Sequence, residues 1–425
     1  MESRVTATDA IFGETERPQS SWDAIVIGAG IAGAATALGL AQRLGRSKKI
    51  LLVERCAWPR DKVCGGCLNA VGVEALDRLG ILTRVRQTGA VPLDAFRLRR
   101  GRRECSLRYE PGLGLARTAL DASLVESAVQ AGVEFNPGCR AVVLPLEQSP
   151  GDRCHDHRSK VRRVVLRHGG GEVVSEAAIV IAADGLAGTS LERLRGFEPR
   201  IAADSWMGLG ATIDHQGTLD AGEVRIYIGD HGYVGLVRLL DSSIHLGAAA
   251  DPAWVKAVGG PARAACLILG TSGEDWDHAV LGARFYGTPA LTRRRNRVAE
   301  QGLLVVGDSA GYVEPFTGEG MAWALQSAEE ASRLAAATLS GQGEPGRSLA
   351  ESWQTWQRVN ARRRERRIRV LRAVLHRPWL ADAAMTLLHL RPIRAAVESE
   401  LRRRPRPDRH TQAVGCVSAP ALGMP

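Results

Sequence analysis

Three glycines and one acidic residue near the amino end of the chain have the types and spacing of a dinucleotide-binding turn. Gly28, Gly30 and Gly33 follow one another in the G-x-G-x-x-G pattern, and Glu54 lies about twenty residues further on. The first glycine of such a pattern permits a tight turn, the second lets a pyrophosphate approach the backbone, and the third lets a helix pack closely on a strand. An acid at that distance can accept hydrogen bonds from ribose hydroxyls. The expected chemistry is therefore the binding of a nucleotide that contains a pyrophosphate.

The neighbouring segments are the ones that this turn requires. Residues 23–27 form a short apolar run with branched side chains, which predicts a buried parallel strand. A helix is expected from Ile31, and its free N–H groups and positive dipole end would face the phosphates. Residues 50–53 predict a second strand that ends at Glu54. A glycine-rich turn without a nucleotide is the alternative, and it leaves this order of strand, turn, helix, strand and acid unexplained.

Length and composition indicate a large protein with more than one domain. The chain has 425 residues, of which 45% are hydrophobic, and its cysteines are scattered rather than spaced as a secreted disulfide framework. Residues 1–20 contain acids and no apolar core, so a loose tail is expected there rather than a signal peptide. No apolar run reaches the roughly 20 residues that a membrane-spanning helix needs. We therefore expect a cytoplasmic protein.

The positive charge is concentrated at the carboxyl end. The excess of arginine over acidic residues from Gly341 to Pro425 equals the whole net charge of +10. Residues 352–376 can form one helix with Trp353 and Trp356 on one face and arginines on the rest. Two roles stay open for this basic helix: its apolar face packs on the rest of the protein, or the helix contacts an anionic membrane peripherally. Nucleic acid is not expected as a partner, because no aromatic residues are interleaved there to stack on bases.

Two further strands are predicted to end in acidic residues. Residues 178–182 lead into Asp184, and residues 302–306 lead into Asp308. After Asp308, the segment from Pro315 to Met321 contains two more glycines. These glycines would leave backbone N–H groups free at the start of a helix, where the groups can stabilise negative charge.

A separate unit is predicted between residues 204 and 250. Four β-like runs lie between turn residues at short spacing, which is typical of an antiparallel sheet: 206–213, 224–228, 233–239 and 244–249.

The order of the three strand-and-turn segments resembles the FAD-dependent oxidoreductases of the p-hydroxybenzoate hydroxylase-type fold, and among them the geranylgeranyl reductase-like branch. The resemblance covers residues 23–339. It implies an α/β fold in which a Rossmann-like FAD-binding domain with a parallel sheet receives an antiparallel-sheet substrate domain and is followed by C-terminal helices. The implied boundaries are 21–92, 109–200 and 291–342 for the FAD-binding domain, 93–108 and 201–290 for the substrate domain, 343–400 for the basic helices, and tails at 1–20 and 401–425.

The resemblance also implies which residues contact the cofactor. The glycine turn and Glu54 would hold the ADP half of FAD, Arg117 would meet its phosphate and ribityl region, and Asp308 would bond the ribityl chain. The full set of implied FAD contacts is Gly28, Gly30, Gly33, Glu54, Arg55, Arg60, Cys64, Gly65, Arg117, Asp184, Asp308, Gly318, Gly320 and Met321. Residues expected beside the flavin ring, where catalysis would occur, are Pro315, Gly318, Gly320 and Cys64. No metal ligands are expected.

The segment from Pro59 to Cys67 resembles the basic Cys-Gly-Gly loop of the reductase branch, which lies against the flavin. Arg60 and Lys62 would then contact FAD or an anionic substrate. Cys64 and Cys67 also form a C-x-x-C pair, which leaves a thiol–disulfide role open. A single C-x-x-C pair is a poor zinc site.

Three functions remain open at this point. The first is a monooxygenase that uses NAD(P)H and O2 to oxygenate a hydrophobic small molecule held between FAD and the antiparallel sheet. The second is the reduction of a lipid or isoprenoid double bond. In the reductase branch a Tyr-x-Trp-x-Phe-Pro stretch lines the isoprenoid channel; this chain keeps Tyr233, the candidate substrate contact, and lacks the rest of the stretch. The third is a membrane-docked flavoprotein that relays electrons. A single dinucleotide fingerprint means that NAD(P)H would visit the flavin only transiently, or that the electrons come from a protein or a quinone.

Overall fold

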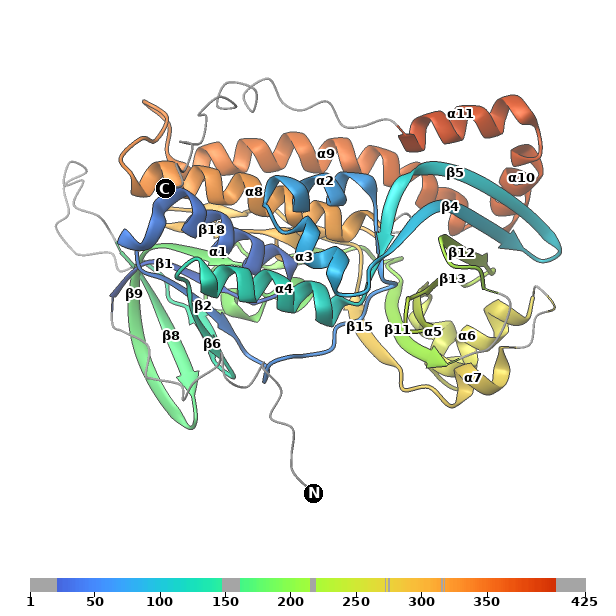
Figure 1. The fold of residues 1–425 in the computed structure, drawn as a ribbon, viewed down its shortest axis with the longest axis horizontal. Helices are drawn as coiled ribbons and strands as arrows, with labels where there is room; N and C mark the ends of the chain where they lie inside the picture. Colours follow the sequence, from blue (N-terminus) through green and yellow to red (C-terminus); the bar gives the residue numbers. More distant parts are fainter. Residues whose placement is uncertain are drawn as a thin grey trace, which may run out of the picture.

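The structure, a computed structural model, describes residues 21–146, 161–214, 219–271, 273, 276–314, 316 and 318–402. Three predicted features lie outside these residues: the tail at 1–20, nearly all of the tail at 401–425, and Pro315. Pro315 is the first residue of the segment 315–321, the flavin loop. Two large sheets lie beside each other, and the C-terminal helices run across both (Figure 1).

The first sheet has a parallel core that carries the glycine turn. Strand β1 (Ser21–Ile27) pairs with β2 (Ile50–Glu54) on one side and with β9 (Gly171–Ala182) on the other. Its central residues Ile25 and Val26 are fully buried, as a parallel strand covered on both faces requires. Further parallel strands are β6 (Glu134–Pro137) and β18 (Leu303–Val305), and antiparallel strands are β7 (Arg140–Val143), β8 (Arg162–His168) and β17 (Ala299–Glu300).

Helix α1 (Ile31–Leu44) begins where the sequence predicts and packs between α4 (Arg117–Gln130) and α8 (Glu319–Leu339). Small residues permit this packing: a Cβ added at Gly39 would lie 2.6 Å from the Oγ of Ser332 on α8. Helix α4 begins at Arg117, and its first turn has no side-chain cap. Asp121, one turn further along α4, binds Arg117. Two shorter helices, α2 (Ala70–Arg78) and α3 (Leu82–Gln87), follow the Cys-Gly-Gly loop.

The second sheet has eight strands, in the order β15-β11-β14-β13-β12-β4-β5-β3. The four strands predicted between residues 204 and 250 form its centre, and all its neighbours are antiparallel except β12 and β4, which are parallel. Helices α5 (Pro252–Ala257), α6 (Pro261–Gly270) and α7 (Asp277–Leu281) cover one face, and the other face turns toward the first sheet. The strands are β3 (Cys67–Leu68), β4 (Val91–Arg100), β5 (Arg103–Gly114), β11 (Met207–Asp214), β12 (Glu223–Ile228), β13 (Gly232–Arg238), β14 (Ser243–Ala250) and β15 (Tyr286–Ala290). A small third sheet joins β10 (Pro199–Ile201), β16 (Arg293–Arg295) and β19 (Gly311–Tyr312).

The basic segment folds as α9 (Leu349–Leu375), α10 (Pro378–Leu388) and α11 (Arg391–Arg402). Trp353 on α9 is fully buried and donates its indole N–H to the Val305 carbonyl, 3.1 Å away. Ile368 and Leu375 are buried as well. The apolar face of α9 therefore packs on the rest of the protein, which is the first of the two roles considered for it. Within the described ranges no helix is both long enough and apolar enough to cross a bilayer.

Candidate FAD and substrate site

The ends of three parallel strands meet at one edge of a cavity of about 430 Å³. The Ala183 N–H donates to Ile27 and the Val306 N–H donates to Ala182, which ties the ends of β1, β9 and β18 together. The predicted acids Asp184 and Asp308 follow two of these ends and line the cavity. The second sheet closes the opposite side. The cavity thus has an FAD half at the strand ends and a sheet half across from it.

The glycine turn is built as its spacing predicts. Gly28 has a φ of +100°, and a Cβ there would lie 2.6 Å from the carbonyl oxygen of Ala183. A Cβ at Gly33 would lie 1.8 Å from the carbonyl oxygen of Gly28, so only glycine lets the helix follow the strand this closely. Gly30 has ordinary backbone angles and no main chain close to it. Its missing side chain leaves open space at the amino end of α1.

Three cationic side chains surround that space. A Cβ at Gly30 would lie 3.4 Å from both Arg60 Nη2 and Lys62 Nζ, and 4.0 Å from Arg117 Nη2. Burial and the nearby Arg117 lower the pKa of Lys62. An anion between these cations would relieve their mutual repulsion and face the positive end of the helix dipole. The arrangement suits a pyrophosphate.

Carboxylates hold two of these cations in place. Arg117 makes three contacts of 3.0–3.1 Å with Asp121, and Arg60 Nε lies 3.0 Å from Glu54 Oε2. Glu54 also accepts the Ala29 N–H at 3.1 Å, so the acid at the end of β2 fastens the glycine turn from behind. Arg55 beside it is exposed and lines the cavity.

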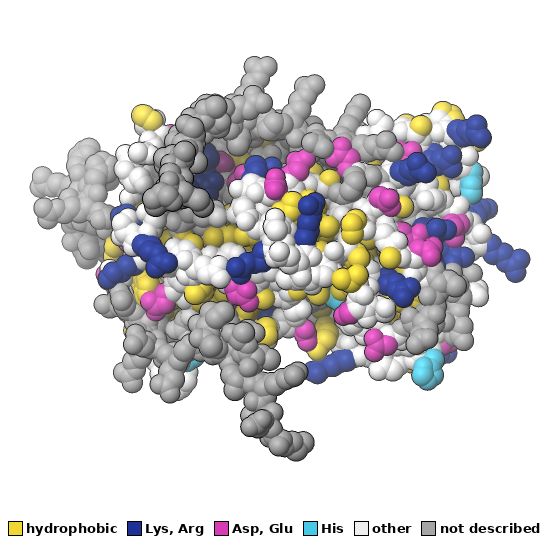
Figure 2. All heavy atoms as spheres, in the orientation of Figure 1, with side chains coloured by type: hydrophobic (Ala, Val, Ile, Leu, Met, Phe, Trp, Pro, Cys, Tyr) yellow, Lys and Arg dark blue, Asp and Glu magenta, His cyan; other side chains and the backbone are white. Residues whose placement is uncertain are grey.

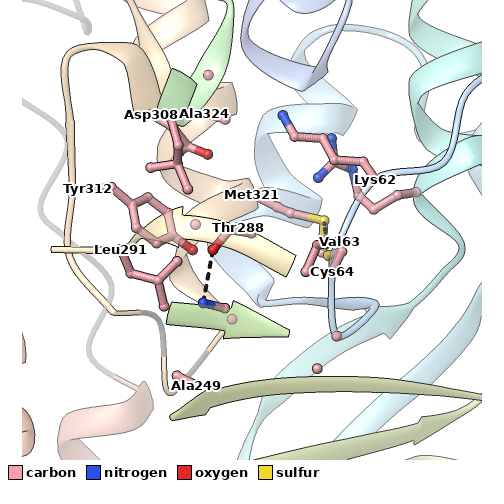
Figure 3. A pocket seen from close by; sticks show the side chains of 18 of the residues that line it. Lys62, Val63, Cys64, Ala249, Thr288, Leu291, Asp308, Tyr312, Met321 and Ala324 are labelled. Carbon is pink, nitrogen blue, oxygen red and sulfur yellow. Dashed lines mark hydrogen bonds between the residues drawn. The ribbon is translucent and has the colours of Figure 1, made fainter. Parts of the chain in front are cut away.

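The two acids after β9 and β18 differ in their partners. Asp184 accepts hydrogen bonds from the Ser190 N–H at 2.8 Å and from the Ser309 hydroxyl at 3.3 Å, and burial raises its pKa. Asp308 has a buried Oδ1 with no hydrogen-bond partner among the described residues. Asp308 and Lys62 face each other across the cavity in Figure 3. An unpartnered carboxylate oxygen in such a place fits a donor on the ligand, such as a ribityl hydroxyl.

The flavin loop reaches the cavity at the start of α8. Gly318 has a φ of +70°, and a Cβ there would lie 2.9 Å from the carbonyl oxygen of Cys67. A Cβ at Gly320 would lie 3.1 Å from the hydroxyl of Tyr312. The first N–H groups of α8 have no intrahelical partners and lie beside the cavity, so they can stabilise negative charge on a bound ring.

The Cys-Gly-Gly loop crosses strand β14 of the second sheet at a point where both segments have a glycine. A Cβ at Gly247 on β14 would lie 2.5 Å from the Cα of Gly65, so glycine is needed for this contact. The Sγ of Cys64 lies 3.8 Å from the Sδ of Met321 at the start of α8 (Figure 3). Cys64 and Cys67 are both thiols in the structure. The loop therefore connects the sheet to the flavin loop.

The sheet half of the cavity is uncharged and mostly apolar. Every described lining residue from β4, β11, β12, β13, β14 and β15 is uncharged. Tyr233 lies in this wall, its ring centre is 5.0 Å from that of Phe316, and its buried hydroxyl has no partner among the described residues. Burial raises the pKa of Tyr233, so the hydroxyl remains protonated. Other apolar residues of this wall are Phe96, Leu209, Val224, Ile226, Ala249 and Leu291.

A buried acid behind the flavin loop was not predicted from the sequence. Glu314 accepts the Trp206 N–H at 3.0 Å and the Thr292 hydroxyl at 3.2 Å, and its Oε2 lies 2.8 Å from Nε2 of His376. His376 follows α9 and stacks on Trp206 with ring centres 3.9 Å apart. The only signal in the sequence is an acid directly before Pro315. The contact attaches the C-terminal helices to the flavin loop.

The residues present fit FAD: cations at the amino end of α1, an unpartnered acid at Asp308, and a wall of apolar side chains. Residues 21–229 match the family model described as the FAD binding domain. The chain therefore contains an FAD binding domain. Three residues beyond the matched range also line the same cavity: Asp308, Gly318 and Gly320. The chain is an FAD-dependent oxidoreductase.

Two characterised relatives extend over most of the chain. It is 27% identical over 365 residues to the menaquinone reductase of Mycolicibacterium smegmatis, which covers 78% of this chain and 79% of that protein. It is 23% identical over 366 residues to conditioned medium factor receptor 1 of Dictyostelium discoideum, which covers 78% of this chain and 66% of that protein.

Solved structures share the fold at low sequence identity. A flavoprotein/dehydrogenase from Cytophaga hutchinsonii superposes with a TM-score of 0.72 at 17% identity, covering 89% of this chain and 92% of that one. The p-nitrophenol 4-monooxygenase of Pseudomonas putida superposes with a TM-score of 0.64 at 16% identity, covering 79% and 84%. The expected fold class, a parallel-sheet FAD domain with an added antiparallel sheet, is confirmed.

Proposed function

We propose that this oxidoreductase is a monooxygenase that takes electrons from NAD(P)H and inserts oxygen into a hydrophobic small molecule. The observation that carries the proposal is the uncharged wall of the second sheet, which stands directly across the cavity from the flavin loop and the FAD half. An apolar wall of this kind selects an uncharged substrate and keeps water from the reacting atoms. FAD, when bound, supplies the electron transfer and the activation of O2.

The chain's own residues then have distinct tasks. Arg60, Lys62 and Arg117 hold the pyrophosphate, and Asp308 accepts a ribityl hydroxyl. The N–H groups at the start of α8 stabilise negative charge on the ring. Tyr233 donates a hydrogen bond to an oxygen of the substrate, because burial keeps its hydroxyl protonated.

A second candidate is a reductase of lipid or isoprenoid double bonds, like the geranylgeranyl reductase-like branch. Similarity to a menaquinone reductase across 79% of that protein favours it. A hydride added to one carbon of a double bond must be followed by a proton on the other carbon. Cys64 is placed to supply that proton, since its thiol lies beside the flavin loop, 3.8 Å from the Met321 sulfur.

Labelled oxygen separates the two candidates. The purified holoprotein is incubated with NAD(P)H, isotope-labelled O2 and a panel of phenols, quinones and polyprenyl compounds, and products are analysed by mass spectrometry. A parallel series runs without O2, with flavin reduced by dithionite. The proposal expects a product that carries one labelled oxygen atom and forms only when O2 is present.

A product that gains two hydrogens without O2 would contradict the monooxygenase and establish the reductase. The Cys64→Ala variant sharpens the test. It should retain oxygenation, whereas a reductase that draws its proton from this thiol should lose turnover at least about tenfold.

A further inference from the structure

Helix α10 presents an apolar stripe to solvent. Trp379 is 67% exposed, Leu387 47% and Leu390, just after the helix, 52%. At 3.6 residues per turn Trp379 and Leu387 lie about 80° apart around the helix, and Leu390 follows just after its end. The opposite side of the helix, with Ala381 and Met385, is buried against the second sheet. One face therefore fixes α10 to the protein and the other is open to a partner.

Arginines stand at both ends of this stripe. Arg377 directly precedes α10, Arg391 begins α11, and both are exposed. Figure 2 shows Lys and Arg side chains gathered at the end of the molecule where Figure 1 places α10 and α11. The stripe itself carries no charge.

The nearby described acids have partners on the second sheet. Asp382 Oδ1 lies 2.9 Å from Arg100 Nε on β4, and Glu398 accepts the Arg108 N–H on β5 at 3.1 Å. They are the only acidic side chains described between residues 377 and 399. The described charged side chains of residues 377–399 are three arginines and these two paired acids, so the surface around the apolar centre has a net positive charge.

We propose that α10 docks the protein on an anionic membrane, with Trp379, Leu387 and Leu390 at the boundary between head groups and acyl chains and with Arg377 and Arg391 on lipid phosphates. Tryptophan and leucine flanked by arginine are typical of helices that lie in this boundary. A second copy of the chain would bring arginines against arginines, because the described acids of this unit are already paired with the second sheet. The apolar face of α9, which the sequence offers for the same purpose, is covered.

Vesicle co-sedimentation of the full-length holoprotein tests this surface. The vesicles are phosphatidylcholine alone or phosphatidylcholine mixed with phosphatidylglycerol, at low and high salt. The test variant is Trp379→Ala/Leu387→Ser/Leu390→Ser. Its matched control is Leu240→Ser/Leu267→Ser, which changes two other exposed leucines. The charge variant Arg377→Gln/Arg391→Gln is compared with the exposed pair Arg193→Gln/Arg195→Gln.

The expected result is binding to anionic vesicles that weakens with salt, falls about tenfold or more in the α10 variant and several-fold in the charge variant, and persists in both controls. Equal binding by the α10 variant and its control, or no binding by the wild type, would overturn the proposal. So would concentration-dependent dimerisation in sedimentation velocity that the α10 variant abolishes. Because the assay measures no turnover, its outcome is independent of the reaction proposed above.

Discussion

The two halves of the cavity are built on different principles. The FAD half uses few residues at fixed places. Glycines stand where two main-chain segments pack closely, and charged groups follow the strand ends. The sheet half uses uncharged residues from six strands, most of them apolar, and the buried hydroxyl of Tyr233 has no partner among the described residues. A cofactor with phosphates and hydroxyls needs specific partners, whereas an apolar substrate needs mainly shape. Substitutions should therefore affect cofactor and substrate separately.

The largest effect is expected from Gly30→Glu. A carboxylate there would occupy the space between Arg60, Lys62 and Arg117 and repel a pyrophosphate, while no main chain lies close enough to disturb the fold. FAD affinity should fall at least about a hundredfold, because like-charge contact costs several kcal/mol. Fluorescence titration of the FAD-free protein measures it, and circular dichroism should show an unchanged fold. If the variant binds FAD with wild-type affinity, the pyrophosphate does not bind at this position.

Asp308→Asn should weaken FAD binding about tenfold to a hundredfold, since it removes the charge from a hydrogen-bond acceptor. The same titration measures the loss, and Asp220→Asn, an exposed acid, is the control. Equal affinity in both variants would show that Asp308 does not contact the cofactor.

Gly235→Val tests the sheet half. A Cβ at Gly235 would point with Ile226 toward the cavity and lies 3.6 Å from its nearest neighbour, so the strand can accept it. The added methyl groups narrow the apolar space, and kcat/KM for the substrate should fall about tenfold while FAD affinity stays constant. Gly235→Ala should have a smaller effect. A loss of FAD together with activity would show that the two halves are not separate.

His376→Ala should lower the free energy of unfolding by about 1–3 kcal/mol, because the buried Glu314 loses a partner and Trp206 loses a stacked ring. Denaturant unfolding of the holoprotein measures it, with the exposed His389→Ala as control. Equal stability of the two variants would argue that this contact does not fasten the C-terminal helices to the flavin loop.

Lys62 gives the smallest and most specific effect, a pH dependence. Burial lowers its pKa below the ordinary value of 10.5, and the phosphates of FAD favour the charged form. Binding therefore takes up a proton once the pH exceeds the pKa of Lys62 in the FAD-free protein. Affinity should fall as the pH rises from that pKa toward the higher pKa in the complex, by at most about tenfold per unit. The Lys62→Met variant should bind FAD more weakly, and its affinity should no longer fall with pH over this range. An unchanged pH dependence would show that another group causes it.

The FAD half could be predicted from the sequence because its signals are local. Gly28, Gly30 and Gly33 lie within one turn, and strand ends of a parallel sheet meet at one edge, which brings Asp184 and Asp308 to the same cavity.

The rest depends on contacts between distant segments. Glu314 and His376 are 62 residues apart and share no spacing pattern. The parallel pairing of β12 with β4 joins strands that are separated in the chain by residues 101–222. Nor does periodicity show which face of α9 or α10 stays exposed, since both helices are amphipathic and only packing against the two sheets decides it.

The most direct test of the division into two halves is FAD titration of three proteins in parallel: wild type, Asp308→Asn and Gly235→Val. The structure predicts that the wild type and Gly235→Val bind FAD with the same affinity and that Asp308→Asn binds at least about tenfold more weakly. A wild type that takes up no FAD, or a Gly235→Val variant that loses affinity as Asp308→Asn does, would contradict it.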